Sequence, residues 1–352
     1  MAPTNPPSDS IVALITGANS GIGYGIAERL LEHYHGSDQT IILILACRNK
    51  QKAIDAQEQL IAKHFDNAAD GQQFVQLLLV DLSNTGSVFA ACAEIKSRFH
   101  HIDFLILNAG IMPISHTSFS GGAKDLFTRP ATLAKTGGDS LVQRMGTVTS
   151  EGLGEVFAAN VFGHYIMVRE LEDTMAASKD ARIVWMSSTT ANPTMMSFED
   201  FQCIKGNYPY ESSKRLGELI SLEMGPYLAE RGIHSFIASP GIVNSGITQG
   251  AISSWMVFGV MIILRLLGLS GINITGKNGA TSTLFLATSE NPKSIDSTKV
   301  FHSEITRFGH RSVEMLSIDS GDALARQNLL VELEALRSKF HALAVKNGYL
   351  KA

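Results

Sequence analysis

A short apolar run followed at once by spaced glycines limits most strongly how this chain can fold. Residues Ile11-Val12-Ala13-Leu14-Ile15 are apolar and largely β-branched, which is typical of a strand buried on both faces in a parallel sheet. Gly17, Gly21 and Gly23 follow, and a helical apolar pattern continues to Leu31. Such glycines permit a tight turn, and the helix N-terminus beyond them attracts a pyrophosphate. This stretch therefore predicts a dinucleotide-binding turn.

The alternation of short apolar runs with helical patterns continues along the chain. Further strands are predicted over residues 40–46, 74–80, 102–107, 182–186, 233–238 and 298–302. Helices are predicted over residues 53–64, 88–99, 153–171, 210–229, 279–288 and 322–343. This order favours right-handed βαβ units. The predicted fold class is α/β: one doubly wound parallel sheet (Rossmann fold) with helices on both faces and long inserts near the active site.

Domain organisation follows from where this alternation stops. Residues 1–10 are rich in Pro, Asn and Ser, carry no signal or transit peptide pattern, and are expected to be a disordered tail. Residues 11–310 are expected to form the nucleotide-binding domain and residues 311–352 a helical extension. Two irregular inserts, 114–150 and 189–209, interrupt the domain, and an apolar segment covers 252–270.

Composition excludes several classes of function. The net charge of −4 leaves no basic surface for nucleic acid. The three cysteines, Cys47, Cys92 and Cys203, are odd in number and widely spaced, which suits a reducing compartment. No histidine or cysteine spacing typical of a metal site is present, so no metal is expected.

The residues after the second predicted strand indicate which dinucleotide binds. An acidic residue there contacts the ribose 2′-hydroxyl of NAD, whereas an arginine accommodates the 2′-phosphate of NADP. The chain has Arg48 and no carboxylate there, which favours NADP; the alternative is an ordinary surface arginine that opens the next helix. Asp81-Leu82 ends the third strand where an adenine would lie, and Asn108-Ala109-Gly110 offers small residues to a cofactor.

A tyrosine and a lysine four residues apart are the candidates for proton transfer. If Tyr210 to Lys214 is helical, the phenol and the ammonium share one face. A cation beside a phenol lowers the phenol pKa, which makes it a usable proton donor or acceptor. Ser188, at the end of the fifth strand, has a hydroxyl that can hold the reacting oxygen. A tyrosine and a lysine at this spacing are common in helices. The catalytic interpretation therefore depends on the dinucleotide-binding turn predicted at the start of the chain.

Together these motifs resemble the short-chain dehydrogenase/reductase family. The matching residues are Thr16-Gly17-x-x-x-Gly21-x-Gly23, Asp81, Asn108-Ala109-Gly110, Asn160, Ser188, Tyr210-x-x-x-Lys214 and Pro240-Gly241. The resemblance implies that Ser188, Tyr210, Lys214 and Asn160 are catalytic. It implies that NADP (as NADPH) is bound by Thr16, Gly17, Asn19, Ser20, Gly21, Ile22, Gly23, Arg48, Asp81, Leu82, Asn108, Ala109, Gly110, Tyr210, Lys214, Pro240, Gly241 and Val243.

Longer stretches resemble the membrane-associated 3-keto-steroid reductases of sterol biosynthesis, whose animal members are also described as type 7 17β-hydroxysteroid dehydrogenases. They include residues 45–49, 107–113, 155–164, 169–172, 199–202 and 209–214. This resemblance implies NADPH-dependent reduction of a 3-keto sterol at the cytoplasmic face of the endoplasmic reticulum or on lipid droplets. It also suggests other sterol-synthesis enzymes as partners.

The apolar segment 252–270 bears on membrane association. As a helix, Trp255 to Leu269 is about 22 Å long, shorter than the roughly 30 Å hydrocarbon core of a bilayer, and Arg265 adds a further cost. A transmembrane span is therefore not expected. A helix in the membrane interface, or an apolar flap over a lipophilic substrate, fits better, with a buried core helix as the alternative.

Other functions remain open at this level. A different lipophilic carbonyl, such as a 17-ketosteroid, retinal or a protochlorophyllide-like molecule, is the alternative substrate class. A non-catalytic NADP-binding sensor or scaffold of a membrane sterol pathway is the alternative outside enzymes, although the chain keeps both Tyr210 and Lys214.

Overall fold

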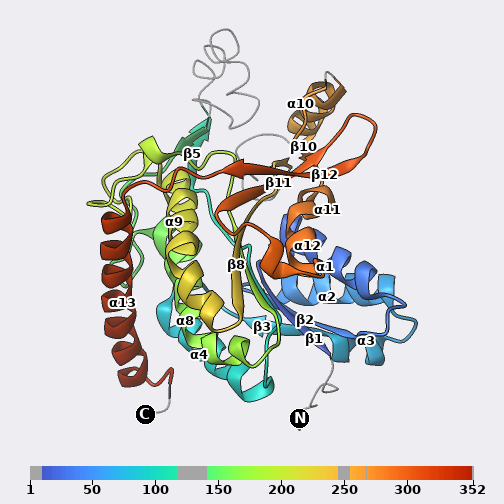
Figure 1. Ribbon diagram of the computed structural model, residues 1–352, viewed down its shortest axis with the longest axis horizontal. Coiled ribbons are helices and arrows are strands. Elements are labelled where there is room, and N and C mark those ends of the chain that lie inside the picture. Colours follow the sequence, from blue (N-terminus) through green and yellow to red (C-terminus); the bar gives the residue numbers. More distant parts are fainter. Residues whose placement is uncertain (1–9, 118–140, 245–253, 267, 351–352) are drawn as a thin grey trace.

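The computed structural model describes residues 10–117, 141–244, 254–266 and 268–350. An eight-stranded sheet lies at its centre (Figure 1), in the order β12-β11-β8-β7-β4-β1-β2-β3. The strands are β1 (Ile11–Thr16), β2 (Ile41–Cys47), β3 (Val75–Leu79), β4 (Phe104–Leu107), β7 (Ala181–Met186), β8 (Ile233–Ser239), β11 (Lys299–Ile305) and β12 (Arg311–Ser317). All neighbours are parallel except β11 and β12, which are antiparallel.

Helices cover both faces of this sheet, because alternate residues of each buried strand point to opposite sides. Val12 and Leu14 of β1 join one apolar core, whereas Ala13 and Ile15 join the other. The first core is covered by α4 (Thr85–Arg98), α8 (Gly163–Ala176) and α9 (Pro209–Glu230), and the second by α1 (Gly21–Tyr34), α2 (Lys50–His64) and α12 (Thr281–Thr288). The predicted doubly wound sheet is confirmed.

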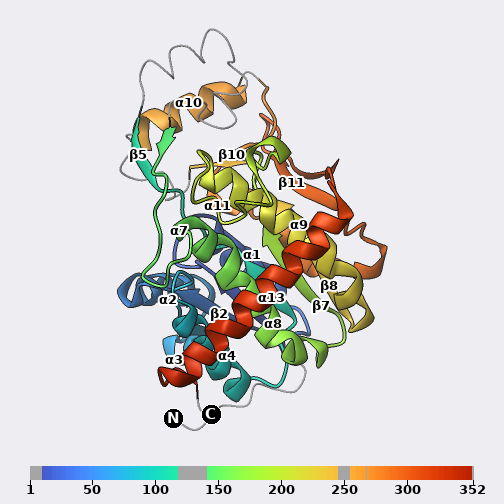
Figure 2. The same cartoon turned by 90° about the vertical axis from the view of Figure 1, so that its left-hand side faces the viewer.

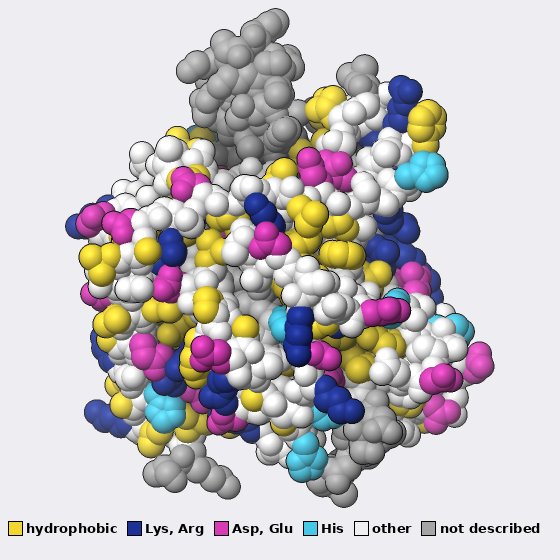
Figure 3. All heavy atoms as spheres, in the orientation of Figure 1, with side chains coloured by type: hydrophobic (Ala, Val, Ile, Leu, Met, Phe, Trp, Pro, Cys, Tyr) yellow, Lys and Arg dark blue, Asp and Glu magenta, His cyan; other side chains and the backbone are white. Residues whose placement is uncertain are grey.

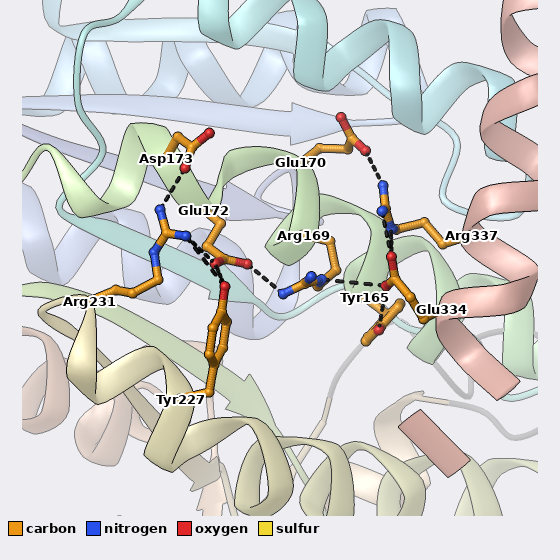
Figure 4. A network of polar contacts seen from close by, with 9 residues as sticks. All are labelled: Tyr165, Arg169, Glu170, Glu172, Asp173, Tyr227, Arg231, Glu334 and Arg337. Atoms are coloured by element: carbon orange, nitrogen blue, oxygen red, sulfur yellow. Dashed lines mark hydrogen bonds and ion pairs between the residues drawn. The ribbon is translucent and has the colours of Figure 1, made fainter. Parts of the chain in front are cut away.

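The C-terminal helix α13 (Ala323–Lys346) runs along the outer flank of the first helical layer (Figures 1 and 2). Leu329, Leu333 and Phe340 are buried there. An ion pair and a hydrogen bond join its polar side to α8 (Figure 4). Arg337 Nη1 lies 2.7 Å from Glu170 Oε1, and the Tyr165 hydroxyl donates to Glu334 at 2.9 Å.

The remaining elements complete the frame. They are α3 (Ala68–Phe74), β5 (Ile114–Thr117), β6 (Leu141–Gln143), α7 (Glu155–Phe157), η2 (Ala158–Phe162), η3 (Pro193–Met195), β9 (Ile242–Val243), α10 (Ser254–Leu266), β10 (Ile272–Ile274), α11 (Gly276–Gly279) and η5 (Pro292–Ser294).

The structure differs from the sequence expectations at three places. Residues 311–317, expected within a helical extension, form β12 of the main sheet, so the predicted boundary after residue 310 divides a hairpin. The insert 114–150 is not wholly irregular, since β5 and β6 pair as an antiparallel ribbon. The single helix expected over 153–171 contains the π-helical turn η2, a feature frequent at functional sites. The expected tail 1–10 lies outside the described residues except for Ser10.

The described side chains of helix α10 differ widely in burial. Met261 is buried against Ile272 and Ile274 of β10, whereas Phe258, Ile263 and Leu266 are exposed by 44%, 58% and 64%. The described part of α10 is therefore not a buried core helix. The hairpin β11–β12 lies at the same end of the molecule, where hydrophobic and basic side chains appear together on the surface (Figure 3). None of the helices described is long and apolar enough to cross a membrane.

Candidate active site

The residues singled out from the sequence follow the carboxyl ends of neighbouring strands. Arg48 follows β2, Asp81 lies shortly after β3, Asn108 follows β4, Ser188 lies just beyond β7, and Gly241 lies just beyond β8. Because these strands are parallel, their carboxyl ends meet at one edge of the sheet, where ligands bind in open α/β folds.

Glycine is required at the turn between β1 and α1. Gly17 has a φ of +66°, which side-chain-bearing residues rarely adopt. A Cβ on Gly23 would lie 2.4 Å from the Gly17 carbonyl oxygen and 2.5 Å from Asn108 Nδ2. The turn thus brings two backbone segments and the first turn of α1 into direct contact, and no side chain fits between them.

The start of α1 fits a bound anion. Ser20, its N-cap residue, makes no side-chain capping bond, and the first turn carries no acidic residue. Four N–H groups at a helix start have no partner within the helix, and they attract negative charge. Arg48 is exposed at the end of β2. This turn, helix and arginine suit a dinucleotide with an additional phosphate.

A buried hydrogen-bond chain joins β1 to the loop after β4. The Thr16 hydroxyl oxygen accepts from the backbone N–H groups of Asn108 and Ala109, each at 2.9 Å. His164 Nδ1 lies 3.0 Å from the Asn160 carbonyl oxygen, so it donates there, and its Nε2 accepts from the Thr16 hydroxyl at 2.9 Å. Burial lowers the pKa of His164 to about 3, which keeps it neutral. His164 was not foreseen because a histidine inside an apolar helix carries no local signal.

Asn160 lies at the centre of the site, in η2. Its side-chain amide donates to Ser213 Oγ at 3.0 Å, and its Oδ1 accepts from the Ile111 N–H at 2.7 Å. A Cβ built on Gly110 would lie 3.3 Å from Asn160 Oδ1 and 3.6 Å from Lys214 Nζ. Asn160, Gly110 and Lys214 are therefore close neighbours.

Ser188, Tyr210 and Lys214 also come together. The Lys214 ammonium lies 5.6 Å from the centre of the Tyr210 ring and donates to the Met186 carbonyl at 2.8 Å. The Ser188 side chain lies near enough to the Tyr210 hydroxyl to favour the phenolate. Ser188 and Tyr210, 22 positions apart in the sequence, thus meet at the carboxyl ends of the parallel strands, because β7 ends there and α9 begins there.

The protonation states differ from expectation. Burial raises the pKa of Tyr210 to about 12, and the hydrogen bond from Ser188 only partly offsets this. Burial also lowers the pKa of Lys214 to about 8. The expected net lowering of the Tyr210 pKa is not found, because the removal of the phenol from water outweighs the hydrogen bond that favours the phenolate. The ammonium lies over the ring and bonds a backbone carbonyl.

The other predicted cofactor residues lie around this edge with differing exposure. Asp81 accepts from the Ser83 N–H and hydroxyl, whereas the Leu82 side chain is buried in the core against α8. Pro240 and Gly241 are supported by Asn273, which donates to the Pro240 carbonyl at 2.6 Å. Asn19, Ile22 and Val243 are partly exposed.

Gln143 is a second residue that the sequence did not predict. Its Oε1 accepts from the Tyr210 N–H at 3.0 Å, and its Nε2 donates to Glu211 Oε2 at 2.7 Å. Gln143 lies on β6, at the end of the insert 114–150, and caps the start of the catalytic helix. A lone glutamine in an irregular stretch gives no sign of this partner 67 residues away.

A cavity of about 510 Å³ opens beside Ser188. Thr189, Ala191 and Pro193, from the insert 189–209, form part of its wall. The opposite wall carries charged side chains of α9, β11 and β12, including Arg215, Glu218, Glu304 and Glu314. Apolar side chains, among them Ile242, Val300 and Leu316, line it as well, so the cavity wall is mixed in polarity.

Comparison with known proteins defines the class. A family model described as short chain dehydrogenase matches residues 11–254. The chain therefore belongs to the short-chain dehydrogenase family.

The similarity to individual relatives extends over nearly the whole length of the chain. The human 3-keto-steroid reductase/17-beta-hydroxysteroid dehydrogenase 7 is 34% identical over 328 residues, covering 92% of this chain and 93% of the relative. A 3-keto-steroid reductase of Schizosaccharomyces pombe is 32% identical over 312 residues, covering 86% and 88%. Similarity to this group extends well beyond the 11–254 core, into β11, β12 and α13.

Solved structures agree in fold. L-sorbose reductase from Gluconobacter frateurii, complexed with NADPH and L-sorbose, superposes with a TM-score of 0.56 at 18% identity, covering 82% of this chain and 93% of that one. A 3-ketoacyl-(acyl-carrier-protein) reductase from Brucella melitensis, complexed with NADH, gives a TM-score of 0.55 at 20% identity, covering 83% and 95%.

Proposed function

We propose that this protein reduces a 3-keto sterol to the 3-hydroxy sterol with NADPH. The observation that carries the proposal is the grouping of Ser188, Tyr210 and Lys214 at the sheet edge, in a chain that is 34% identical over 92% of its length to a protein named 3-keto-steroid reductase. The same grouping without such relatives would support only a carbonyl reductase of unspecified substrate.

The cofactor residues act by binding and orientation. The Gly17–Gly23 turn and the start of α1 would hold the pyrophosphate, and Arg48 would bind the 2′-phosphate. Asp81-Leu82 would lie beside the adenine, Asn108-Ala109-Gly110 would let the cofactor approach closely, and Pro240-Gly241 and Val243 would lie beside the nicotinamide end. NADPH, when bound, supplies the hydride.

Ser188 and Tyr210 manage the charge that forms on the ketone oxygen. Ser188 donates a hydrogen bond to that oxygen, which stabilises developing negative charge. Tyr210 transfers its proton to the same oxygen. Because its pKa is raised to about 12, the phenol is fully protonated at neutral pH and acts as a proton donor.

Lys214 and Asn160 support this proton donor. The Lys214 cation, held over the Tyr210 ring, stabilises the phenolate left after proton transfer. Asn160, whose amide bonds Ser213, fixes α9 against η2. As the family resemblance implies, it would also anchor a chain of water molecules behind the lysine, through which protons reach the site.

The substrate assay separates the alternatives. Purified protein is mixed with NADPH and a 3-ketosterol, a 17-ketosteroid or retinal in detergent micelles, and NADPH oxidation is followed with product analysis. We expect turnover with the 3-ketosterol at a kcat/KM at least about tenfold above the others, the scale of one well-placed contact. Equal or faster reduction of retinal overturns the sterol assignment. Binding of NADPH with no turnover of any ketone favours the non-catalytic scaffold.

We further propose that α10, within segment 252–270, attaches the protein peripherally to the membrane that contains its substrate. Its exposed Phe258, Ile263 and Leu266 support this, since an apolar helix face of this kind partitions into the membrane interface. We propose the cytoplasmic face of the endoplasmic reticulum or lipid droplets as the location, as the resemblance to membrane-associated sterol reductases implies, with other sterol-synthesis enzymes as the expected partners.

Vesicle sedimentation tests the attachment. We expect a variant with Ser at positions 258, 263 and 266 to lose most of its binding to phospholipid vesicles while NADPH affinity is retained. Val331→Ser on α13, where the side chain is 69% exposed, is the matched control and should bind like wild type. Unchanged sedimentation of the triple variant contradicts attachment through α10.

A further inference from the structure

Two cavities meet at one acidic side chain, Glu218. The smaller cavity, of about 10 Å³, lies behind Lys214 and is lined by Asn160, Ser213 and Glu218 among others. That volume is about what one water molecule needs. The larger cavity, of about 510 Å³, begins at Ser188. Glu218 is the residue that lines both of them.

The Glu218 carboxylate is buried but still has capacity to bind water. Its Oε1 accepts from the Ser187 hydroxyl at 2.6 Å, and its Oε2 accepts from Arg215 Nη1 at 3.0 Å. The side chain is 7% exposed. A carboxylate offers about four acceptor positions, so these two bonds leave positions free toward the cavities.

The charged groups around Glu218 come from every element that packs near it. Lys214 and Arg215 lie on α9, Glu304 on β11, Glu314 on β12 and Asp319 in the loop after β12, and the titratable His164 and His302 lie on α8 and β11. Burial raises the pKa of Glu218, although its bonds to Ser187 and Arg215 act in the opposite direction. The protonated form is therefore reached at a higher pH than for an ordinary glutamate.

We propose that Glu218 returns protons from water in the larger cavity, through one water in the smaller cavity, to the Lys214–Tyr210 pair. This inference rests on the proposed function. Each ketone reduction consumes one proton, which Tyr210 gives to the substrate oxygen, and the pair is left one proton short. The Glu218 carboxylate first takes a proton from water in the larger cavity and then gives it to the bridging water, which passes one on to the pair. Glu218 ends as the carboxylate it began as, and the solution supplies the one proton that each turnover consumes, so protons balance without another reactant.

Glu218 touches neither substrate nor cofactor in this scheme, so its effect is confined to turnovers after the first. Tyr210 begins protonated, and the first reduction needs no proton from Glu218. A purely structural ion pair between Glu218 and Arg215 would instead support the geometry of α9 and act on every turnover alike. The difference between first and later turnovers separates the two roles.

The chain offers a matched control in Glu172. Its carboxylate is also buried and accepts from Arg169 Nη1 at 2.6 Å and from the Tyr227 hydroxyl, with Arg231 Nη1 at 2.9 Å (Figure 4). It lines neither of the two cavities. Glu172→Gln thus disturbs a buried arginine–glutamate network without touching the proposed proton route.

The experiment is a stopped-flow reaction of wild type, Glu218→Gln and Glu172→Gln with NADPH and excess 3-ketosterol. For Glu218→Gln we expect a first turnover at the wild-type rate and later turnovers at least about tenfold slower, less than the loss expected for a direct proton donor. Added formate or imidazole, small enough to enter the larger cavity, should restore the later turnovers of this variant and leave Glu172→Gln unchanged. Ser187→Ala, which removes the hydroxyl that orients Glu218, should show the same pattern more weakly and serves if Glu218→Gln does not fold.

The outcomes are distinguishable. An equally slowed first turnover in Glu218→Gln, wild-type later turnovers in both variants, or failure of rescue overturns the proton route while the reductase function stands. Absence of ketone reduction in wild type overturns the reductase function, and the proton route with it.

Discussion

The nucleotide-side turn and the α10 end of the molecule are built in opposite ways. At the turn, backbone meets backbone: a Cβ on Gly23 would lie 2.4 Å from the Gly17 carbonyl, and the Thr16 hydroxyl is fully bonded inside the protein. At the α10 end, Phe258 and Leu266 are exposed by 44% and 64%. The first region fixes where a cofactor and a proton donor lie, and the second offers apolar surface to something outside the chain. Changes at the strand ends should therefore alter chemistry or cofactor binding, and changes on α10 should not.

The largest expected effect is that of Tyr210→Phe. Loss of the phenolic proton should lower kcat for ketone reduction by at least about 10²-fold, the scale of general acid catalysis, while NADPH affinity changes little. Tyr208→Phe, at a neighbouring exposed position, is the control and should keep wild-type kcat. A loss smaller than tenfold in Tyr210→Phe would assign the proton to another group.

Gly23→Ala should act on cofactor binding. The added methyl must displace backbone and Asn108 Nδ2, and overpacking of this kind costs about 1–3 kcal/mol. Isothermal titration should then show NADPH binding weakened by roughly 10- to 100-fold. At Gly225 on α9 an added Cβ meets nothing within 4 Å, so Gly225→Ala should bind normally. Unchanged NADPH affinity in Gly23→Ala would contradict the view that the turn leaves no room for a side chain.

Arg48→Ala tests cofactor choice. A charged hydrogen bond to the 2′-phosphate contributes about 1.5–3 kcal/mol, so the preference for NADPH over NADH should fall roughly tenfold or more. Lys179→Ala, an exposed cation after α8, is the control for lost positive charge. If the ratio of kcat/KM with NADPH to kcat/KM with NADH does not change, Arg48 is an ordinary surface arginine and does not select the cofactor.

The smallest expected effect is the pH dependence of the first turnover. Burial lowers the pKa of Lys214 to about 8, so the lysine is charged below that pH and neutral above it. The rate should therefore fall as pH rises, to about half at pH 8. Tyr210, with its pKa raised to about 12, stays protonated throughout and cannot cause the fall. A rate that rises between pH 7 and 9 would show that Lys214 does not act as a cation.

Much of the strand-end region was predictable because its signals are local. The run from Ile11 into Gly17 and Gly23 encodes a strand, a turn and a helix within a few residues, and Tyr210 and Lys214 share a face through helical geometry alone. What was missed depends on tertiary placement. Gln143 reaches Tyr210 from a separate ribbon, and β12 pairs at the sheet edge although most of its residues are exposed.

The direction of the Tyr210 pKa was the clearest error, and its cause is physical. Sequence spacing places Lys214 beside the phenol but says nothing of how far both are removed from water. Burial works against both charged forms, and only the packed structure reveals it. Similarly, Glu218 resembles any polar residue of an amphipathic helix until the two cavities are located.

The most direct test of the account is isotopic transfer. Purified protein is incubated with a 3-ketosterol and NADPH deuterated at nicotinamide carbon 4, one stereoisomer at a time, and the sterol is analysed by mass spectrometry. We predict that wild type places one deuterium on carbon 3 of the 3-hydroxy sterol from one of the two stereoisomers, and that Tyr210→Phe forms at least about 10²-fold less of this product. Product without deuterium from either stereoisomer, or equal labelling by Tyr210→Phe at the wild-type rate, would contradict it.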